Sequence, residues 1–195
     1  MPISKGSSYG APGGLPPDGV VCSSDAEARA VLEAARRESR PYPPIGLTGG
    51  DLCHTLGGRS RLEVVVPVDL GMAMLDGRMH LFVAHAIARN RTWTRAVAAM
   101  NAQWLGEWNL GPRAHPNDGL LDVYEGHLTF GDLPKVRARL HHGVHLPHPR
   151  IKEQRRPAVQ VTLARPTPVR LDGVLVGTFR DLALRVEPDV LTVVV

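Results

Sequence analysis

Two short segments in the first third of the chain carry residues suited to binding phosphate. Residues 23–27 read SSDAE and residues 47–51 read LTGGD, and each segment overlaps or follows a short apolar run typical of a buried strand. Where a strand passes into a turn or a helix, backbone N–H groups point toward a bound anion, and the helix dipole favours its negative charge. The two junctions therefore indicate a phosphate-binding site.

Histidine and cysteine suggest a second chemistry, metal binding. The chain has nine His, and four of them lie between residues 141 and 148. They follow a helix predicted over about residues 132–140, and an imidazole is favourable at a helix C-terminus without a metal. No HExxH or CxxC spacing accompanies them, and the only cysteines are Cys22 and Cys53. The sequence therefore argues against a zinc site and a disulfide framework, and a reducing cytoplasm is expected.

Composition narrows the class of protein. Of 195 residues, 43% are hydrophobic and 22% charged, and the chain has 20 Gly and 17 Pro. These are globular values, and frequent Gly and Pro predict short elements joined by tight turns, which favours strands over long helices. No apolar run approaches the roughly 20 residues needed to span a bilayer, so any membrane contact is expected to be peripheral.

The formal net charge of +4 predicts attraction to phosphate-bearing partners. No five Lys or Arg follow one another, and the Trp residues are not interleaved with basic ones, so no nucleic acid partner is expected. A predicted basic loop is either simply solvated or in contact with anionic lipid. Its cations are Arg150, Lys152, Arg155 and Arg156.

The elements that would position the two junctions lie at the start of the chain. Residues 1–19 are rich in Gly, Pro and Ser, which predicts a disordered leader. A strand then runs into a helix that begins at Ser24, where the S-x-x-E spacing to Glu27 forms a capping box. A second strand and a short helix follow, so residues 20–60 are interpreted as a small α/β unit.

The remainder, residues 61–195, is predicted to form an antiparallel β-sandwich. Asp-Gly pairs at 76–77 and 172–173 each separate two apolar runs, which is a strong hairpin signal. Residues 101–122 are dense in Gly, Pro, Asn and Asp and predict a shaped connection able to carry function. Residues 93–102 fit a strand or a short helix equally well. The predicted fold class is α+β, mainly β.

Three further segments carry a resemblance to a known family. They read GPRAHPNDGLLDV at 111–123, HLPHP at 145–149 and VRLDG at 169–173. As a set they resemble the C-terminal lobe of the bacterial diacylglycerol kinase and lipid kinase family, which includes the eukaryotic sphingosine kinases. The resemblance covers, with gaps, about residue 20 to residue 195. It implies ATP-dependent phosphoryl transfer to a lipid hydroxyl by a β-sandwich lobe that follows a nucleotide-binding α/β lobe.

In that family, a GGDGT loop and a GTGND loop together cradle the ATP phosphates, and SSDAE and LTGGD stand at the matching positions here. Side chains replace three glycines of the first loop, where the family's backbone approaches the nucleotide closely. The first strands and helices of the family's nucleotide domain are expected to be absent before Val20. The resemblance implies ATP as a cofactor, bound by Ser23, Ser24, Asp25, Thr48, Gly49, Gly50 and Asp51.

The resemblance also assigns a catalytic role to Asp172, because the family has a D-G-E motif at this hairpin, near the reacting hydroxyl. Here Val174 stands in place of the Glu, and Asp-Gly is equally an ordinary hairpin turn. A structural Mg²⁺ is implied as well, held by the carbonyls of His115 and Leu120 and by Asp118. The alternative at this acidic turn is an Asx turn without metal.

Three hypotheses of function remain open. The first is a lipid-kinase-like protein with impaired catalysis that acts by binding lipid or a partner, with an anionic membrane surface as the expected partner. The second is an active lipid kinase whose nucleotide site is completed by a homo-oligomer or a second chain. The third is a structural or protein-interaction module. Trp104 and Trp108 are placed near a lipid entrance by the first two hypotheses, or are core aromatics.

Overall fold

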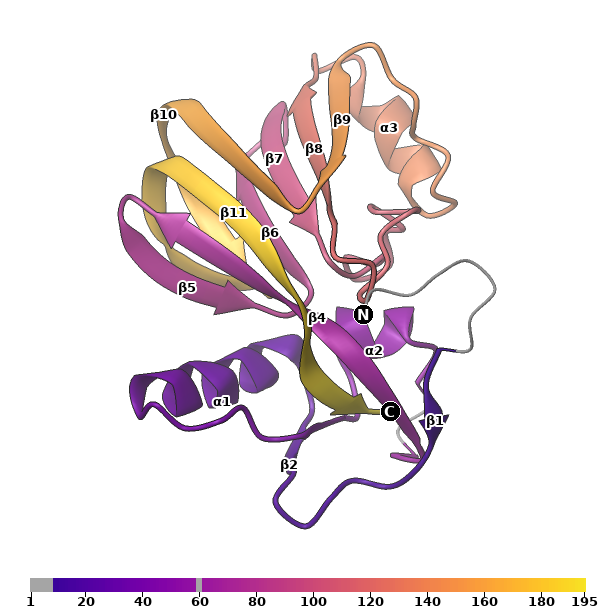
Figure 1. Ribbon diagram of the computed structural model, residues 1–195. Helices are drawn as coiled ribbons and strands as arrows, with labels where there is room; N and C mark the ends of the chain where they lie inside the picture. The colour runs from indigo at the N-terminus through magenta and orange to yellow at the C-terminus, as the bar shows by residue number, and fades with distance from the viewer. Residues whose placement is uncertain (1–8, 59–60) are drawn as a thin grey trace.

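The computed structural model describes residues 9–58 and 61–195. Helices are few and strands dominate, as Figure 1 shows. In chain order the described elements are β1 (Ala11–Pro12), β2 (Val20–Cys22), α1 (Asp25–Arg37), β3 (Ile45–Leu47), α2 (Asp51–Thr55), β4 (Val64–Leu75), β5 (Arg78–Phe82), β6 (His85–Arg89), β7 (Arg95–Met100), β8 (Leu121–His127), α3 (Leu133–Leu140), β9 (Ile151–Arg156), β10 (Ala158–Leu171) and β11 (Val174–Val194).

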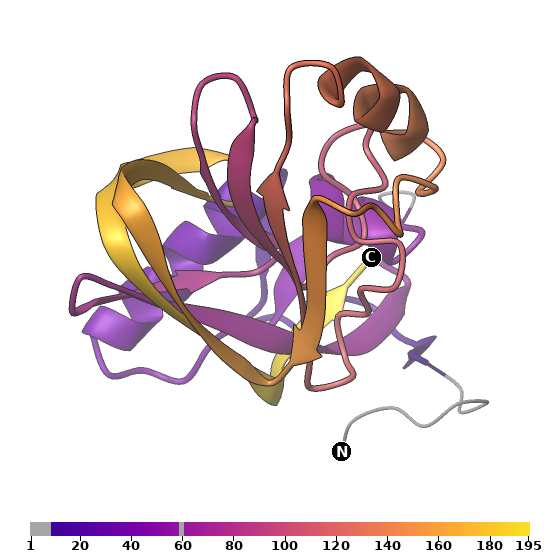
Figure 2. The same cartoon turned by 90° about the horizontal axis from the view of Figure 1, so that it is seen from above.

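The strands form one sheet that folds over on itself. Its hydrogen-bonded order is β1-β4-β11-β10-β6-β7-β8-β9, with β5 beside β4 and with β3, which pairs β2, beside β11. Neighbours along that order are antiparallel, whereas β2–β3 and β3–β11 are parallel. The half made by β4, β5, β10 and β11 faces the half made by β6 to β9 (Figures 1 and 2). The predicted fold class, mainly β with an antiparallel sandwich, is confirmed.

Small and branched side chains fill the interior of the sandwich. Leu75 of β4 and Leu184 of β11 belong to one buried cluster with Ala86 of β6, Ala99 of β7 and Val123 of β8. Alanine at these positions lets the two halves approach closely, and burial of the branched residues supplies the apolar area that stabilises the fold. The alternating pattern of the strands is the local cause, because successive residues point to opposite faces.

The α/β unit forms as its sequence predicts. Ser24 caps α1 by accepting a hydrogen bond from the Glu27 N–H at 3.3 Å, and Glu27 reaches back to the Ser23 N–H at 2.7 Å. The inner face of α1 places Leu32 in a cluster with Leu47 of β3 and with β4 residues such as Val68. The unit therefore shares one core with the sandwich rather than having a core of its own.

The outer face of β6 to β8 is covered by α3 and by the loop between β7 and β8. Met100 and Tyr124 on that face lie in one buried cluster with Leu110 of the loop and with Val136 and Leu140 of α3. In Figure 1, α3 lies at the edge of the molecule, far from α1. The shaped connection predicted over residues 101–122 thus serves as a cover for the sheet.

Two predictions about elements need correction. The predicted leader, residues 1–19, is ordered over 9–19: β1 pairs with β4, and the Tyr9 hydroxyl donates to the Pro67 carbonyl at 2.9 Å. The reason is tertiary, because the open edge of β4 offers backbone partners that a Gly- and Pro-rich segment can use. Residues 1–8 lie outside the described part of the chain.

The predicted basic loop is the other correction. Residues 151–156 form β9, which pairs antiparallel with β8 from Gly126↔Ile151 to Leu121↔Arg156. Its sequence IKEQRR lacks an apolar alternation because an edge strand needs little burial on either face. The alternatives left open over residues 93–102 are settled in favour of a strand, β7.

Candidate functional site

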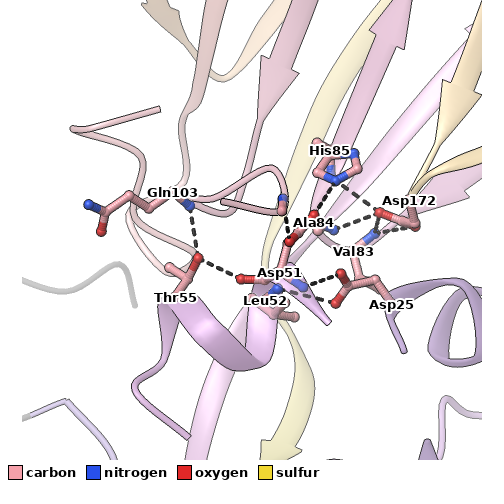
Figure 3. A network of polar contacts seen from close by, with 10 residues as sticks. Asp25, Asp51, Leu52, Thr55, Val83, Ala84, His85, Gln103 and Asp172 are labelled. Atoms are coloured by element: carbon pink, nitrogen blue, oxygen red, sulfur yellow. Dashed lines mark hydrogen bonds and ion pairs between the residues drawn. The ribbon is translucent and has the colours of Figure 1, made fainter. Parts of the chain in front are cut away.

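Five charged or titratable side chains meet where the α/β unit joins the sandwich, and we call them the carboxylate junction. Figure 3 shows Asp25, Asp51, His85 and Asp172 of this group. Its members are Arg29, Asp25, Asp51, His85 and Asp172. They come from α1, from the start of α2, from the start of β6 and from the turn between β10 and β11. The junction unites the two segments predicted to bind phosphate with the predicted catalytic residue.

Asp25 is bound to the start of α2. Its carboxylate accepts hydrogen bonds from the N–H groups of Asp51, at 2.6 Å, and Leu52, at 3.2 Å. Gly50 makes this approach possible: its φ is +97°, and a Cβ there would lie 2.6 Å from Asp25 Oδ1. The side chain of Asp25 therefore takes the position at this helix end that an anionic ligand would use.

Asp51 continues the network. Its Oδ2 lies 2.8 Å from Nε2 of His85, and its Oδ1 accepts from the Gly106 N–H at 2.8 Å. His85 is buried on β6, while Gly106 belongs to the loop between β7 and β8. This one carboxylate thus connects α2 to both the sandwich and its covering loop.

Asp172 is fully enclosed. Its carboxylate accepts from the N–H groups of Val83, Ala84 and His85 at 2.9 to 3.3 Å, and Arg29 Nε lies 3.8 Å away. Its φ of 50° places it in the left-handed region that an Asp in an Asp-Gly turn tolerates. Asp172 thus holds the turn between β5 and β6 and has no open face toward a substrate hydroxyl.

Burial and mutual repulsion govern protonation in the junction. Burial, then the charge of Asp172, raise the pKa of Asp25 to about 7. Burial also raises the pKa of Asp172, against the opposing effect of His85 and the three N–H donors. Burial lowers the pKa of His85, but the Asp51 hydrogen bond and the neighbouring carboxylates outweigh it, so the pKa is raised. The junction therefore holds protons near neutral pH that exposed carboxyls would release.

The other predicted nucleotide-binding residues are also engaged. Ser23 donates its hydroxyl to Glu27 at 2.9 Å, and Ser24 caps α1. Thr48 bonds the Cys22 carbonyl through its N–H, and a Cβ at Gly49 would lie 2.5 Å from the Ser23 carbonyl oxygen. The two loops pack against each other. The residues present do not fit a phosphate cradle, because the N–H groups at the start of α2 donate to Asp25.

The predicted magnesium site is arranged as an Asx turn. Asp118 accepts from the Leu120 N–H at 3.0 Å through one oxygen and pairs with Arg155 through the other. Nδ1 of His115 accepts from the Asn117 N–H at 3.2 Å. In the described ranges, no group of three or more His, Cys, Asp or Glu is placed to hold a metal. With both Asp118 oxygens engaged, the turn does not fit the implied Mg²⁺.

A cavity that sequence reasoning missed lies between α3 and the outer face of β7 and β8. We call it the α3 cavity; its volume is about 110 Å³ and its wall is mostly apolar. Its lining residues are Thr92, Trp93, Ala96, Ala98, Trp108, Leu110, Tyr124, Gly126, Leu128, Leu133, Val136, Arg137, Leu140, His145 and Ile151. Small residues on the two strands create the space, because Ala96, Ala98 and Gly126 have little or no side chain to fill it.

Two polar side chains in the wall of the α3 cavity are poorly paired. Among residues 9–58 and 61–195, the buried Tyr124 hydroxyl finds no hydrogen-bond partner, and neither ring nitrogen of His145 has a partner of full hydrogen-bond geometry. Burial lowers the pKa of His145, with the Leu110 carbonyl opposing that shift. The rings of Tyr124 and His145 are 6.4 Å apart. An apolar cavity with a few unpaired polar groups is the usual form of a small-molecule site.

Trp104 and Trp108, which the sequence analysis considers together, lie in different parts of the structure. Trp108 lines the α3 cavity, in edge contact with Trp93 at 5.6 Å. Trp104 instead stacks on His54 of α2 at 4.3 Å. Nothing in the sequence spacing of Tyr124 and His145 predicted that they would share a wall. The available sequence signal was the small residues Ala96, Ala98 and Gly126, which leave room beside larger aromatic side chains.

Residues 62–195 match the profile of the YegS C-terminal NAD kinase beta sandwich-like domain. The chain belongs to this family. The match covers the sandwich from just before β4 to the C-terminus and agrees with the resemblance to lipid kinases seen in the sequence. No curated protein matches the chain.

Solved structures with a similar fold are described as diacylglycerol kinases. Two structures described as "a putative diacylglycerol kinase from Bacillus anthracis str. Sterne" match 91% of this chain at 13% identity, with TM-scores of 0.65 and 0.67. The match covers 78% and 76% of those chains. A third, a diacylglycerol kinase of the same organism, has a TM-score of 0.54 at 15% identity over 78% of this chain and 67% of its own. At such identities the likeness establishes the fold alone.

No helix within the described ranges is long and apolar enough to cross a membrane.

Proposed function

We propose that this protein is a lipid-kinase-like lobe that binds the apolar part of a lipid in the α3 cavity and does not transfer phosphate on its own. The observation that carries the proposal is the cavity itself. Its wall is apolar apart from a few groups; within the described residues the Tyr124 hydroxyl has no partner, and the His145 ring has only a weak contact with the Leu110 carbonyl. A buried polar group without a partner costs about 1–3 kcal/mol, so a ligand that pairs with it would bind favourably.

The ligand class follows from this wall. An acyl chain would contact Leu110, Val136 and Leu140, while a hydroxyl or ester oxygen would pair with Tyr124 or His145. A diacylglycerol or another neutral lipid with an oxygen near its chain has both parts. A strongly charged ligand is disfavoured, since Arg137 is the one Lys or Arg among the described lining residues, and it lies over the Trp108 ring at 5.6 Å.

The carboxylate junction supports the second half of the proposal. Phosphoryl transfer to a lipid hydroxyl requires a carboxylate that reaches the hydroxyl and a cradle for the nucleotide phosphates. Asp172 accepts three backbone N–H groups, and Asp25 occupies the start of α2. Val174 has no group that accepts a proton. The resemblance implies ATP and Mg²⁺. Among the described residues, the start of α2 and the Asp118 turn, which would hold them, are engaged by contacts within the protein.

The test is a titration with a short-chain diacylglycerol below its micelle concentration, followed by tryptophan fluorescence. Trp93 and Trp108 line the cavity and report its occupancy directly. Gly126→Leu fills the cavity, since a Cβ there meets nothing closer than 3.9 Å, and is expected to weaken binding about tenfold or more. Gly14→Leu, at an exposed and equally open glycine, is the matched control and leaves binding unchanged.

Two further measurements complete the test. Titration with Mg·ATP is expected to give no heat at millimolar nucleotide, and labelled ATP is expected to transfer no phosphate to diacylglycerol micelles. Equal lipid affinity in wild type and Gly126→Leu, with both folded, would reject the cavity as the site. Label transfer by the purified chain would reject the non-catalytic half of the proposal and favour a kinase completed by oligomerisation.

A further inference from the structure

The segment that surrounds α3 exposes two large apolar side chains. Phe130, three residues before α3, is 73% exposed, and Val144, four residues after it, is 59% exposed. The helix between them is roughly 12 Å long at 1.5 Å per residue. Single exposed apolar residues are ordinary, but here one precedes and one follows the same helix, which lies at the edge of the molecule in Figure 1.

The exposed side of α3 itself is basic. Lys135, Arg137 and Arg139 are exposed, while Val136 and Leu140 point into the molecule. Between residues 127 and 150 there are four Lys or Arg and one acid, Asp132. Within the described residues, Lys135 and Arg139 have no carboxylate within ion-pair distance. This charge is therefore available to an anionic surface.

The exposed phenylalanine is held in place by the chain around it. Asp132 Oδ2 accepts from both the N–H and the hydroxyl of Thr129, at 2.8 and 2.6 Å, and the Asp132 N–H donates to the Thr129 carbonyl at 3.1 Å. Arg150 lies 3.3 Å from the same carboxylate. Phe130 thus lies in a turn closed by hydrogen bonds. Little backbone conformational entropy therefore remains to be lost when its side chain is buried against a partner surface.

More cations border Phe130 from the neighbouring strands. Phe130 shares a shallow surface hollow with Arg95 and His127, and His127 shares a second hollow with Arg150 and Lys152. Lys152 is 3.5 Å from Glu125, so part of this charge is balanced, whereas no carboxylate within the described ranges lies within ion-pair distance of Arg95. The basic surface therefore continues from α3 past Phe130 to the ends of β7 and β9.

We infer that this surface, from His127 to Arg150 with Arg95 beside it, docks on an anionic lipid bilayer. Phe130 and Val144 insert among the acyl chains, and the cations contact the lipid phosphates. Apolar insertion combined with basic residues is how peripheral proteins bind such membranes. Leu128, Leu133 and Arg137 line the α3 cavity from this side, so docking would bring the cavity to the bilayer; this last step rests on the proposed lipid-binding function.

The test is sedimentation of the full chain with phosphatidylcholine vesicles, with and without phosphatidylglycerol. The wild type is expected to bind only the anionic vesicles, and less at high salt. Lys135→Glu with Arg139→Glu is expected to weaken binding more than about tenfold, from about fivefold per cation removed. Phe130→Ser is expected to weaken it about tenfold through lost insertion. All three sites are exposed, so folding is not at risk.

Matched controls change the same properties elsewhere. Arg78→Glu with Arg180→Glu alters the net charge equally at exposed sites, and Leu175→Ser removes a side chain that is 52% exposed. Both controls are expected to bind like wild type. Failure of the wild type to bind anionic vesicles, or equal losses in the controls, would overturn the inference and leave a protein partner as the occupant of this surface.

Failure of this inference can be told from failure of the proposed function. Gly126→Leu fills the cavity and is expected to retain vesicle binding while losing the short-chain lipid. Phe130→Ser is expected to show the reverse. Loss of both activities in either variant, with the fold intact, would overturn the assignment of two separate sites.

Discussion

The carboxylate junction and the α3 cavity differ in whether their oxygen atoms have hydrogen-bond partners within the described protein. At the junction, every oxygen of Asp25, Asp51 and Asp172 has a donor from the protein itself. In the wall of the cavity, the Tyr124 hydroxyl has no hydrogen-bond partner in the part of the chain that the structure describes, and the small residues of β7 and β8 leave space beside it. The carboxylates of the first region are satisfied by the protein, although Arg29 Nε and His85 Nδ1 beside them have no hydrogen-bond partner within the described residues. The second region leaves a hydroxyl for which we propose a ligand partner.

The contrast teaches that residues singled out by a motif can already be engaged by the protein itself, while less conspicuous residues line the available space. The junction holds residues that the sequence singles out, yet their contacts are to the protein itself. Asp25 binds the start of α2, Asp172 binds the turn between β5 and β6, and Asp51 links α2 to the sandwich. Most of the cavity wall comes from residues outside the family-resembling segments, although His145 begins the HLPHP segment. Three experiments follow that would break or sharpen this difference.

The largest expected effect is on stability at the junction. Asp172→Ala removes the acceptor of three buried N–H groups and leaves Arg29 without its nearest carboxylate, which is expected to cost about 3 kcal/mol or more. Urea unfolding measures the loss. Asp172→Asn keeps one acceptor oxygen and tolerates a φ of 50°, so it is expected to cost less. Equal, small losses of unfolding free energy in both variants would show that the contacts of Asp172 contribute little to stability.

The second effect is a pH dependence. The pKa of Asp25 is raised above its ordinary value to about 7, so the folded state takes up a proton that the unfolded chain has released. Its contribution to stability is therefore present at low pH and falls as pH rises from about 4 through 7. The raised pKa of His85 acts in the same direction, since its stabilising protonated form is lost as pH rises through its folded pKa.

Thermal unfolding measures this dependence. The melting temperature is expected to fall by roughly 5 °C between pH 5 and pH 8, from the junction together with Asp122, whose pKa burial raises to about 6. Asp25→Asn is expected to reduce the slope, and the exposed Asp18→Asn is expected to leave it unchanged. A slope that is the same in Asp25→Asn and wild type would exclude Asp25 as its source.

The smallest effect, at the cavity, has the opposite sign for stability. Tyr124→Phe removes an unpaired buried hydroxyl and is expected to leave stability unchanged or raise it by up to about 1 kcal/mol. The same change is expected to weaken binding of short-chain diacylglycerol about fivefold, the loss of one hydrogen bond. A clear loss of stability with unchanged affinity would show that the hydroxyl has a partner inside the protein.

Local patterns explain how much of the fold was predictable. The capping box at Ser24, the Asp-Gly turns at 76–77 and 172–173 and the alternation in the strands each depend on residues close together in the chain. Each produced the predicted element. The edge pairings of β1 and β9 were missed because their partners lie far along the sequence and their own residues show no apolar pattern.

The sequence by itself determined the sandwich, the α/β unit and the family, because these follow from periodicity, turn chemistry and motifs. Only the tertiary structure decided what the motif residues do. Asp172 meets the backbone of Val83 across 89 positions of the chain, and Asp25 meets Asp51 across 26. Whether a carboxylate faces a ligand or a buried N–H depends on such distant contacts, and residue identity and local spacing carry no information about them.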